Sequence, residues 1–144
     1  MPQKVILEGD QPTKFILLGE DDADDQEMLT DVFSSIDKSF ILLFVNNGKE
    51  VVSALEKLKD EQMPCLIVLD YNMPGLTGAD ILREIGQNMR YKDVPKIVWS
   101  TSGSDKFKKV CLELGATDYV IKPSNNTDLE KIARYMLSIC NIIT

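Results

Sequence analysis

The chain has 144 residues, of which 44% are apolar and 27% charged, which fits one globular domain and is too apolar for disorder. Its formal net charge of −7 disfavours direct binding to nucleic acid or to an anionic membrane surface. These residues include no histidine, which excludes Ser-His-Asp and Cys-His nucleophile systems and imidazole-based zinc sites within them. Any phosphohistidine chemistry would therefore need a histidine from another protein.

Cysteine usage and the length of the apolar runs favour a cytoplasmic protein. Cys65, Cys111 and Cys140 form no Cys-x-x-Cys motif and leave an odd thiol under any pairing, so we expect reduced thiols. The longest apolar run, from Phe40 to Val45, is far shorter than the roughly 20 residues of a membrane-spanning helix. The N-terminus also lacks the apolar stretch of a signal peptide.

After a leader over residues 1–13, short apolar runs alternate with segments that have apolar residues at helical spacing. The apolar runs predict five buried strands, at 14–18, 40–45, 65–69, 95–99 and 118–121. The helical segments predict five helices, at 23–36, 49–60, 79–85, 105–114 and 128–140. This alternation predicts an α/β fold with a parallel sheet covered by helices on both faces.

Charged or hydroxyl-bearing side chains follow four of the five predicted strands, whereas the strand at 40–45 is followed by Asn46 and Asn47. In chain order the charged and hydroxyl-bearing residues are Glu20, Asp21, Asp22, Asp70, Ser100, Thr101 and Lys122. The carboxyl ends of parallel strands share one edge of the sheet, and ligands bind in the crevice outside that edge. We therefore expect several carboxylates, a hydroxyl group and an ammonium group to converge there.

The residue types at this edge suit phosphoryl transfer. Neighbouring carboxylates repel one another unless they hold a hard cation, and Mg²⁺ prefers oxygen ligands. A carboxylate can also act as a nucleophile that forms an aspartyl-phosphate. A lysine and a hydroxyl group could then neutralise and position the phosphoryl oxygens.

Each of these residues also has an ordinary structural explanation. An acidic cluster before a helix is commonly a solvated turn with a capping aspartate, and we interpret Asp24 and Asp25 in this way. A strand-terminal aspartate, a serine at the start of a loop and a surface lysine are each common. Their joint occurrence at four strand ends is what favours a functional site.

In these motifs the sequence resembles the receiver domain of two-component response regulators, from about Lys14 to the last helix. The shared motifs are the acidic pair after the first strand, Val-Leu-Asp-Tyr-Asn-Met-Pro-Gly-Leu-Thr-Gly around Asp70, the hydroxyl residue after the fourth strand, and Tyr-Val-Ile-Lys-Pro at 119–123. The resemblance implies a flavodoxin-like, doubly wound five-stranded parallel sheet in strand order 2-1-3-4-5 with five helices. It places a receiver domain at 14–144, stand-alone and chemotaxis-regulator-like, after the leader at 1–13.

The resemblance also assigns roles to the acidic residues. Asp70 is expected to be the phosphoacceptor. Glu20 and Asp21 are expected to bind Mg²⁺ together with Asp70 and the backbone carbonyl group of Asn72. The acidic triplet leaves the register of the pair open by one residue, with Asp22 as the neighbour.

The remaining family positions fall at the ends of the last two strands. Ser100 is expected to contact the phosphoryl group and to move on activation, and a register shift of one would give that role to Thr101. Lys122 is expected to pair with a phosphoryl oxygen, and the peptide bond before Pro123 to be cis. The ring of Tyr119 is expected to turn inward when the hydroxyl residue shifts.

By resemblance, a histidine kinase or histidine phosphotransfer protein would phosphorylate Asp70 in a Mg²⁺-dependent reaction. Phosphorylation would switch a surface formed by the fourth helix, the fifth strand and the fifth helix, which would bind a downstream protein. The residues expected on that surface are Lys106, Phe107, Lys108, Lys109 and Tyr119. We expect no enzymatic activity beyond autodephosphorylation, and neither nucleic acid nor membrane as a direct partner.

Three alternatives stay open at this point. A phosphatase of the haloacid-dehalogenase type usually has Asp-x-Asp, whereas this chain has Asp70-Tyr71-Asn72, and asparagine cannot act as the general acid. A flavin or nucleotide site would need a Gly/Ser/Thr-rich phosphate loop after the first strand, where this chain is acidic. The third alternative is an interaction module that works unphosphorylated.

Overall fold

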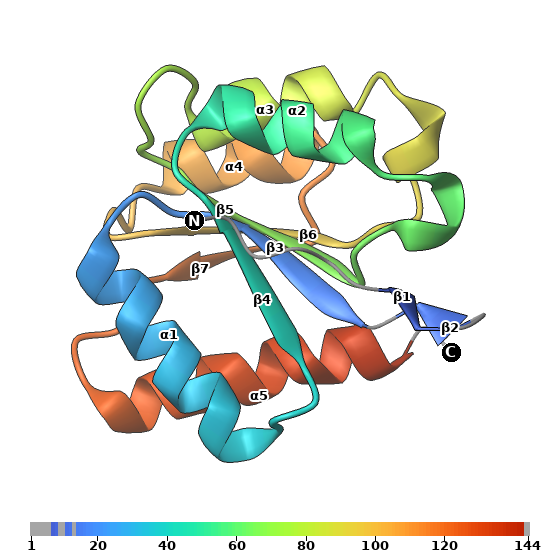
Figure 1. Ribbon diagram of the computed structural model, residues 1–144. Coiled ribbons are helices and arrows are strands. Elements are labelled where there is room, and N and C mark those ends of the chain that lie inside the picture. Colours follow the sequence, from blue (N-terminus) through green and yellow to red (C-terminus); the bar gives the residue numbers. More distant parts are fainter. Residues whose placement is uncertain (1–6, 9–10, 13, 143–144) are drawn as a thin grey trace.

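A five-stranded parallel sheet lies between two layers of helices in the computed structural model, which describes residues 7–8, 11–12 and 14–142 (Figure 1). Its strands are β3 (Phe15–Gly19), β4 (Ile41–Val45), β5 (Leu66–Asp70), β6 (Lys96–Ser100) and β7 (Asp118–Ile121). They are ordered β4-β3-β5-β6-β7, and all four pairings are parallel. When the strands of this sheet alone are numbered along the chain, the order is 2-1-3-4-5, so the predicted fold class and strand order are confirmed.

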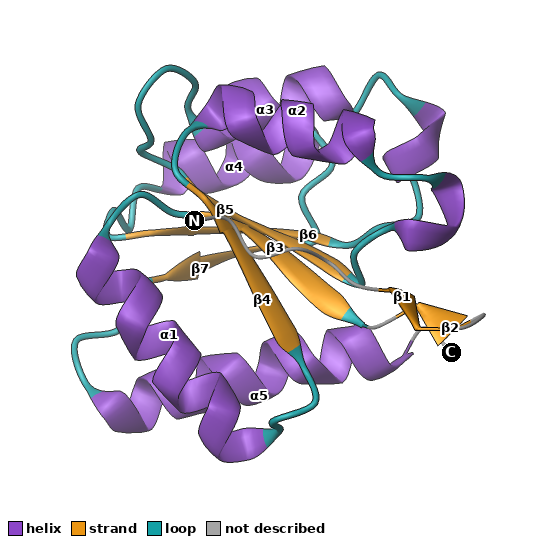
Figure 2. Cartoon of the chain, viewed as in Figure 1, coloured by secondary structure: helices purple, strands orange, loops and turns teal. Residues whose placement is uncertain are grey.

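Five helices cover the two faces of the sheet (Figure 2). One face carries α1 (Ala23–Ile36) and α5 (Asn126–Ile142); the other carries α2 (Gly48–Lys57), α3 (Gly78–Ile85) and α4 (Asp105–Glu113). In β3, Phe15 and Leu17 pack toward α2 and α3, whereas Ile16 and Leu18 pack toward α1 and α5. Burial on both faces explains why the strands read as continuous apolar runs rather than as alternating patterns.

Three of the central strands extend one residue beyond the apolar run that predicted them. Gly19, Asp70 and Ser100 close β3, β5 and β6, although the expected strands ended one residue earlier. The ladder continues through these residues, since Gly19 pairs with Val45 and Asp70 pairs with Trp99. Hydrophobicity marks which side chains are buried, whereas backbone hydrogen bonds decide where a strand ends. As a result, Asp70 and Ser100 are held by the sheet rather than by loops.

The start of the chain and two connections contain elements that the sequence did not indicate. Within the expected leader, β1 (Leu7–Glu8) pairs antiparallel with β2 (Gln11–Pro12), and residues 1–6, 9–10 and 13 lie outside the described residues. Two single 3₁₀ turns, at Asp60–Gln62 and Met89–Tyr91, follow α2 and α3. Among the described residues, no helix is long and apolar enough to cross a membrane.

The expectation of three reduced thiols is wrong. Cys65 and Cys140 form a disulfide with a Cα–Cα distance of 5.0 Å, and Cys111 is free and buried. Cys65 directly precedes β5, and α5 runs antiparallel to the strands, so its last turns return to the edge where the strands begin. The topology therefore brings together two cysteines that are 75 residues apart in the sequence.

The expectation of a cis peptide bond before Pro123 is also wrong, because the bond between Lys122 and Pro123 is trans. The two isomers of a bond that precedes proline differ by only about 0.5–1 kcal/mol, so the local sequence alone does not decide between them.

Candidate functional site

Three carboxylates meet at the carboxyl edge of the sheet. Asp70 ends β5, and Glu20 and Asp21 directly follow the neighbouring strand β3. One oxygen atom from each of the three lies within 4.8 Å of the others. The strand register produces this proximity, because Gly19 pairs with Leu69 and the residues that follow them stay side by side.

Burial makes these carboxylates electrostatically costly. The exposed fraction is 0% for Glu20 and 6% for Asp70, whereas Asp21 is exposed. Burial raises the pKa of Glu20 to about 7, and the nearby charge of Asp70 adds to the rise, while a hydrogen bond from Lys122 opposes it. A cation at this edge would offset the cost of holding these groups ionised.

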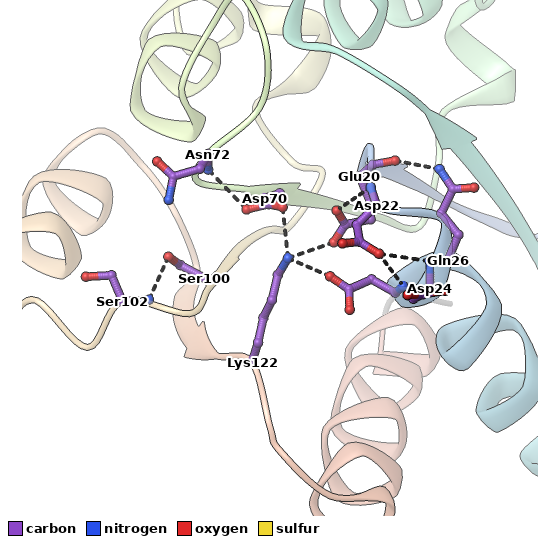
Figure 3. Close-up of polar contacts among 10 residues, drawn as sticks. Glu20, Asp22, Asp24, Gln26, Asp70, Asn72, Ser100, Ser102 and Lys122 are labelled. Atoms are coloured by element: carbon purple, nitrogen blue, oxygen red, sulfur yellow. Dashed lines mark hydrogen bonds and ion pairs between the residues drawn. The ribbon is translucent and has the colours of Figure 1, made fainter.

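Lys122 supplies one positive charge to the cluster (Figure 3). Its Nζ atom donates to Glu20 Oε1 at 2.9 Å, to Asp25 Oδ2 at 2.9 Å and to Asp70 Oδ2 at 2.8 Å. It also lies 4.9 Å from the centroid of the Trp99 ring. Burial works against the charged form of Lys122, but the hydrogen bonds to the three carboxylates outweigh it and raise its pKa.

Asp70 is contacted at both carboxylate oxygens. The backbone N–H group of Asn72 donates to Oδ1 at 3.0 Å, and Lys122 donates to Oδ2 (Figure 3). Ser100 follows the residue that pairs with Asp70 across the sheet, is fully buried, and accepts a hydrogen bond from the N–H group of Ser102 at 3.1 Å. Thr101, the alternative hydroxyl residue, is exposed.

Within the acidic triplet, Asp22 differs from its neighbours. It caps α1, and its Oδ1 atom accepts from the N–H groups of Asp24 at 2.8 Å and Asp25 at 3.1 Å. The capping aspartate is therefore Asp22, and not Asp24 or Asp25 as expected. The carboxylates that face Asp70 are those of Glu20 and Asp21.

The sequence matches the profile of the response regulator receiver domain over residues 16–134. The chain belongs to this family. The predicted family resemblance is thereby confirmed, and the match covers the five-stranded sheet except Phe15 and about half of α5.

Similar curated proteins are two-component response regulators of rice. The response regulator ORR5 of Oryza sativa subsp. japonica is 29% identical over 122 residues, which are 85% of this chain and 87% of that protein. The response regulator ORR7 of Oryza sativa subsp. indica is 34% identical over 107 residues, which cover 72% of this chain and 52% of that protein.

Solved structures with the same fold include receivers with a metal ion or a phosphoryl group. The Mn²⁺-bound form of response regulator Rcp1 is 30% identical with a TM-score of 0.76, and the match covers 87% of this chain and 92% of that one. The phosphorylated cyanobacterial phytochrome response regulator RcpA is 26% identical with a TM-score of 0.77, and the match covers 85% and 90%.

The donor set of this receiver domain fits a hard divalent cation. Glu20, Asp21 and Asp70 offer three carboxylate oxygens at one point, and carboxylate oxygens are the ligands that Mg²⁺ prefers. The pKa of Glu20 is raised by burial despite its hydrogen bond from Lys122, so a further positive charge there would favour its carboxylate form. For Asn72, the contact that the structure shows is that of its backbone N–H group, so the role of its carbonyl group stays a prediction.

Sequence reasoning missed one member of the receiver site. Asp25 lies in the first turn of α1 and was interpreted as part of a solvated helix start, yet it forms an ion pair with Lys122. Its separation of 97 residues from Lys122 leaves no local signal. Helical spacing does not reveal it either, because Asp21 precedes the extended N-cap residue Asp22 and so lies outside α1.

The predicted aromatic switch residue lies in the core. Tyr119 is 6% exposed, and its hydroxyl group donates to the carbonyl oxygen of Ser102 at 2.8 Å. Phe107 is half-buried and stacks on Tyr71 with a centroid distance of 4.5 Å. Two aromatic contacts thus tie the β6–α4 loop and the start of α4 to the strands that carry the site.

Proposed function

We propose that this receiver domain accepts a phosphoryl group on Asp70, in a Mg²⁺-dependent reaction, from a phosphohistidine of a kinase or a phosphotransfer protein. The observation that carries the proposal is the surroundings of Asp70. Its carboxylate is bonded to Lys122 and to the N–H group of Asn72, and it lies within 4.8 Å of the oxygens of Glu20 and Asp21.

In the proposed reaction, a carboxylate oxygen of Asp70 forms a bond to phosphorus while the P–N bond of the phosphohistidine breaks. The bonding electron pair leaves with the imidazole nitrogen, which takes up a proton. Lys122 donates to a phosphoryl oxygen in place of Asp70 Oδ2, and Ser100 supplies a hydroxyl donor. Glu20, Asp21 and Asp70 are the residues that would hold Mg²⁺, which would supply neutralisation of charge on the phosphoryl oxygens.

The relatives support this chemistry. The similar proteins are two-component response regulators, and one similar structure is a phosphorylated receiver. A third structure, the receiver domain of the sensor histidine kinase PA1611 of Pseudomonas aeruginosa PAO1, has a magnesium ion in its active-site cleft. We propose that Asp70 carries the phosphoryl group in this chain and that Asp70 and its acidic neighbours bind the magnesium ion.

We further propose that phosphorylation switches the surface formed by α4, β7 and α5, and that a downstream protein binds there in the cytoplasm. Movement of Ser100 toward the phosphoryl group would shift Ser102, whose carbonyl oxygen accepts the hydrogen bond from Tyr119. The switch would thereby reach α4, where Lys106, Lys108 and Lys109 are exposed.

The proposed activity ends with the protein's own aspartate, so the receiver domain turns over no free substrate beyond its own phosphoryl group. The test is intact mass after incubation with Mg²⁺ and acetyl phosphate. The wild type should gain one phosphoryl group and Asp70→Asn none. A mass gain in Asp70→Asn, or none in the wild type, would refute the assignment. Steady turnover of a phosphate monoester would instead support the phosphatase alternative.

A matched pair of variants tests the metal assignment. Asp21→Asn should lose most of its Mg²⁺ affinity in a calorimetric titration, whereas Asp22→Asn should retain it, because Asp22 caps α1 and does not face Asp70. The reverse result would move the acidic pair by one residue and contradict the proposed ligand set.

A further inference from the structure

All three N–H donors of Lys122 are engaged in this structure. An ammonium group has three donors, and those of Lys122 contact Glu20, Asp25 and Asp70 at 2.8–2.9 Å. The side chain of Lys122 is 12% exposed and that of Asp25 is 20% exposed, so water screens these contacts weakly. A new acceptor can reach Lys122 only if one of the three carboxylates releases its hydrogen bond.

The three carboxylates are not equivalent with respect to the proposed chemistry. Glu20 and Asp70 belong to the group of oxygens that can hold a cation, and Asp70 loses its charge when it becomes an acyl phosphate. Asp25 does not belong to that group, and neither a metal at the cluster nor a phosphoryl group on Asp70 would neutralise it. In the phosphorylated state, Asp25 keeps its full negative charge, and its carboxylate can still accept a hydrogen bond from Lys122.

We propose that Asp25 is a positioning residue that holds Lys122 in its resting place and competes with the phosphoryl group for its ammonium group. This inference rests on the proposed phosphorylation of Asp70. Asp25 lies on α1, whereas Lys122 follows β7, so the ion pair also joins two elements that are far apart in the sequence.

The proposed competition predicts that removal of the Asp25 charge stabilises the phosphorylated state. A charged acceptor binds an ammonium group more strongly than a neutral amide oxygen of the same shape. Replacement of Asp25 by asparagine keeps the oxygen acceptor but removes its charge, and it also removes a negative charge close to the incoming phosphoryl group. Lys122 then bonds more strongly to a phosphoryl oxygen, and the phosphorylated state gains stability relative to the resting state.

The chain offers a matched control at the neighbouring position. Asp24 lies in the same first turn of α1 and has the same charge, but it is exposed, and the contacts described for Lys122 do not include it. Asp24→Asn therefore reports the general effect of removing one negative charge from this helix turn. Asp25→Glu keeps the charge and tests whether a carboxylate at this position restores wild-type behaviour.

The experiment is a beryllofluoride titration of the wild type and the three variants in the presence of Mg²⁺, followed by tryptophan fluorescence. Trp99 is the single tryptophan of the chain, and its ring lies 4.9 Å from Lys122 Nζ, so it also reports the position of Lys122 without any ligand. Asp25→Asn should bind beryllofluoride about fivefold more tightly than the wild type, as expected for exchange of a charged for a neutral hydrogen-bond acceptor. Asp24→Asn should stay within about twofold, as expected for an exposed charge.

The outcomes separate this inference from the proposed function. Tighter binding by Asp25→Asn, wild-type affinity in Asp25→Glu, and altered ligand-free fluorescence only in Asp25→Asn support the inference. Equal affinities for Asp25→Asn and Asp24→Asn, or weaker binding by Asp25→Asn, overturn it while the wild type still binds and the proposed function stands. A wild type that does not bind beryllofluoride overturns the proposed function, and the competition with it.

Discussion

Reduction of the disulfide between Cys65 and Cys140 should lower the free energy of unfolding of this protein. The bond closes a loop of 75 residues, and loss of that constraint on the unfolded chain corresponds to about 4.5 kcal/mol. For a domain of this size, such a loss lowers the melting temperature by about 15 °C. Urea unfolding of the wild type, with and without a phosphine reductant, measures the difference directly.

Reduction isolates the cross-link from the packing around it. Cys140 is fully buried among the residues between α5 and the sheet, so a Cys140→Ala variant loses packing as well as the bond. Reduced wild type keeps both sulfur atoms in place. Cys111 serves as the internal control, because it lies in the other core layer and burial raises its thiol pKa, which keeps it protonated.

Two results would refute this reasoning. Thiol titration of the denatured, unreduced protein should find only Cys111, and three reactive thiols would mean that the disulfide does not form. If one thiol is found but reduction leaves the urea midpoint unchanged, the loop does not constrain the unfolded chain as calculated. A Cys111→Ala variant should respond to the reductant as the wild type does.

Four further predictions concern the site and the residues that support it. Mg²⁺ affinity should increase as the pH rises through about 7, because burial raises the pKa of Glu20 to about 7 and the metal binds the carboxylate form; Glu20→Gln should remove this pH step in calorimetry. Without metal, the stability that Glu20 contributes is complete below its ordinary pKa of 4.5 and is lost as the pH rises through about 7, so urea midpoints should fall over that range in the wild type but not in Glu20→Gln. Asp22→Ala should cost about 1 kcal/mol of unfolding free energy as a lost helix cap, and an unchanged urea midpoint would contradict the capping role. Gly19→Val should cost about 1–3 kcal/mol, because a Cβ atom at this position would lie 2.8 Å from Cε of Met73 and 2.9 Å from Cγ2 of Val51. A Met73→Ala background should relieve part of this cost and leave the contact with Val51.

The fold could be predicted from the sequence because each buried strand is a continuous apolar run and each helix has one apolar face. Five strands and five helices were expected, and the strand order followed from the family resemblance. The predicted ends of β3, β5 and β6 each fell one residue before the observed ends. Gly19, Asp70 and Ser100 are not apolar, but their backbones still pair with the neighbouring strands.

The sequence predicts those site residues that directly follow an apolar strand, but not those that reach the site from elsewhere. Asp70 and Lys122 follow apolar runs and were found in this way. Asp25 lies within a helix, where its neighbours in sequence say nothing about which residue reaches Lys122. The disulfide was missed for the same reason, since Cys65 and Cys140 meet only after α5 has packed against the sheet.

The position of Lys122 in the chain gives the site an order of assembly. Its three carboxylate partners precede it by 52, 97 and 102 residues, so the acidic residues are synthesised long before the lysine that binds them. A nascent chain, or a fragment cut before β7, contains the aspartate but not the ammonium group. Long-range pairings of this kind also form slowly during folding. If Asp70 accepts a phosphoryl group as proposed, Lys122 can assist that reaction only after β7 has joined the sheet, and chains that lack β7 should not be phosphorylated efficiently.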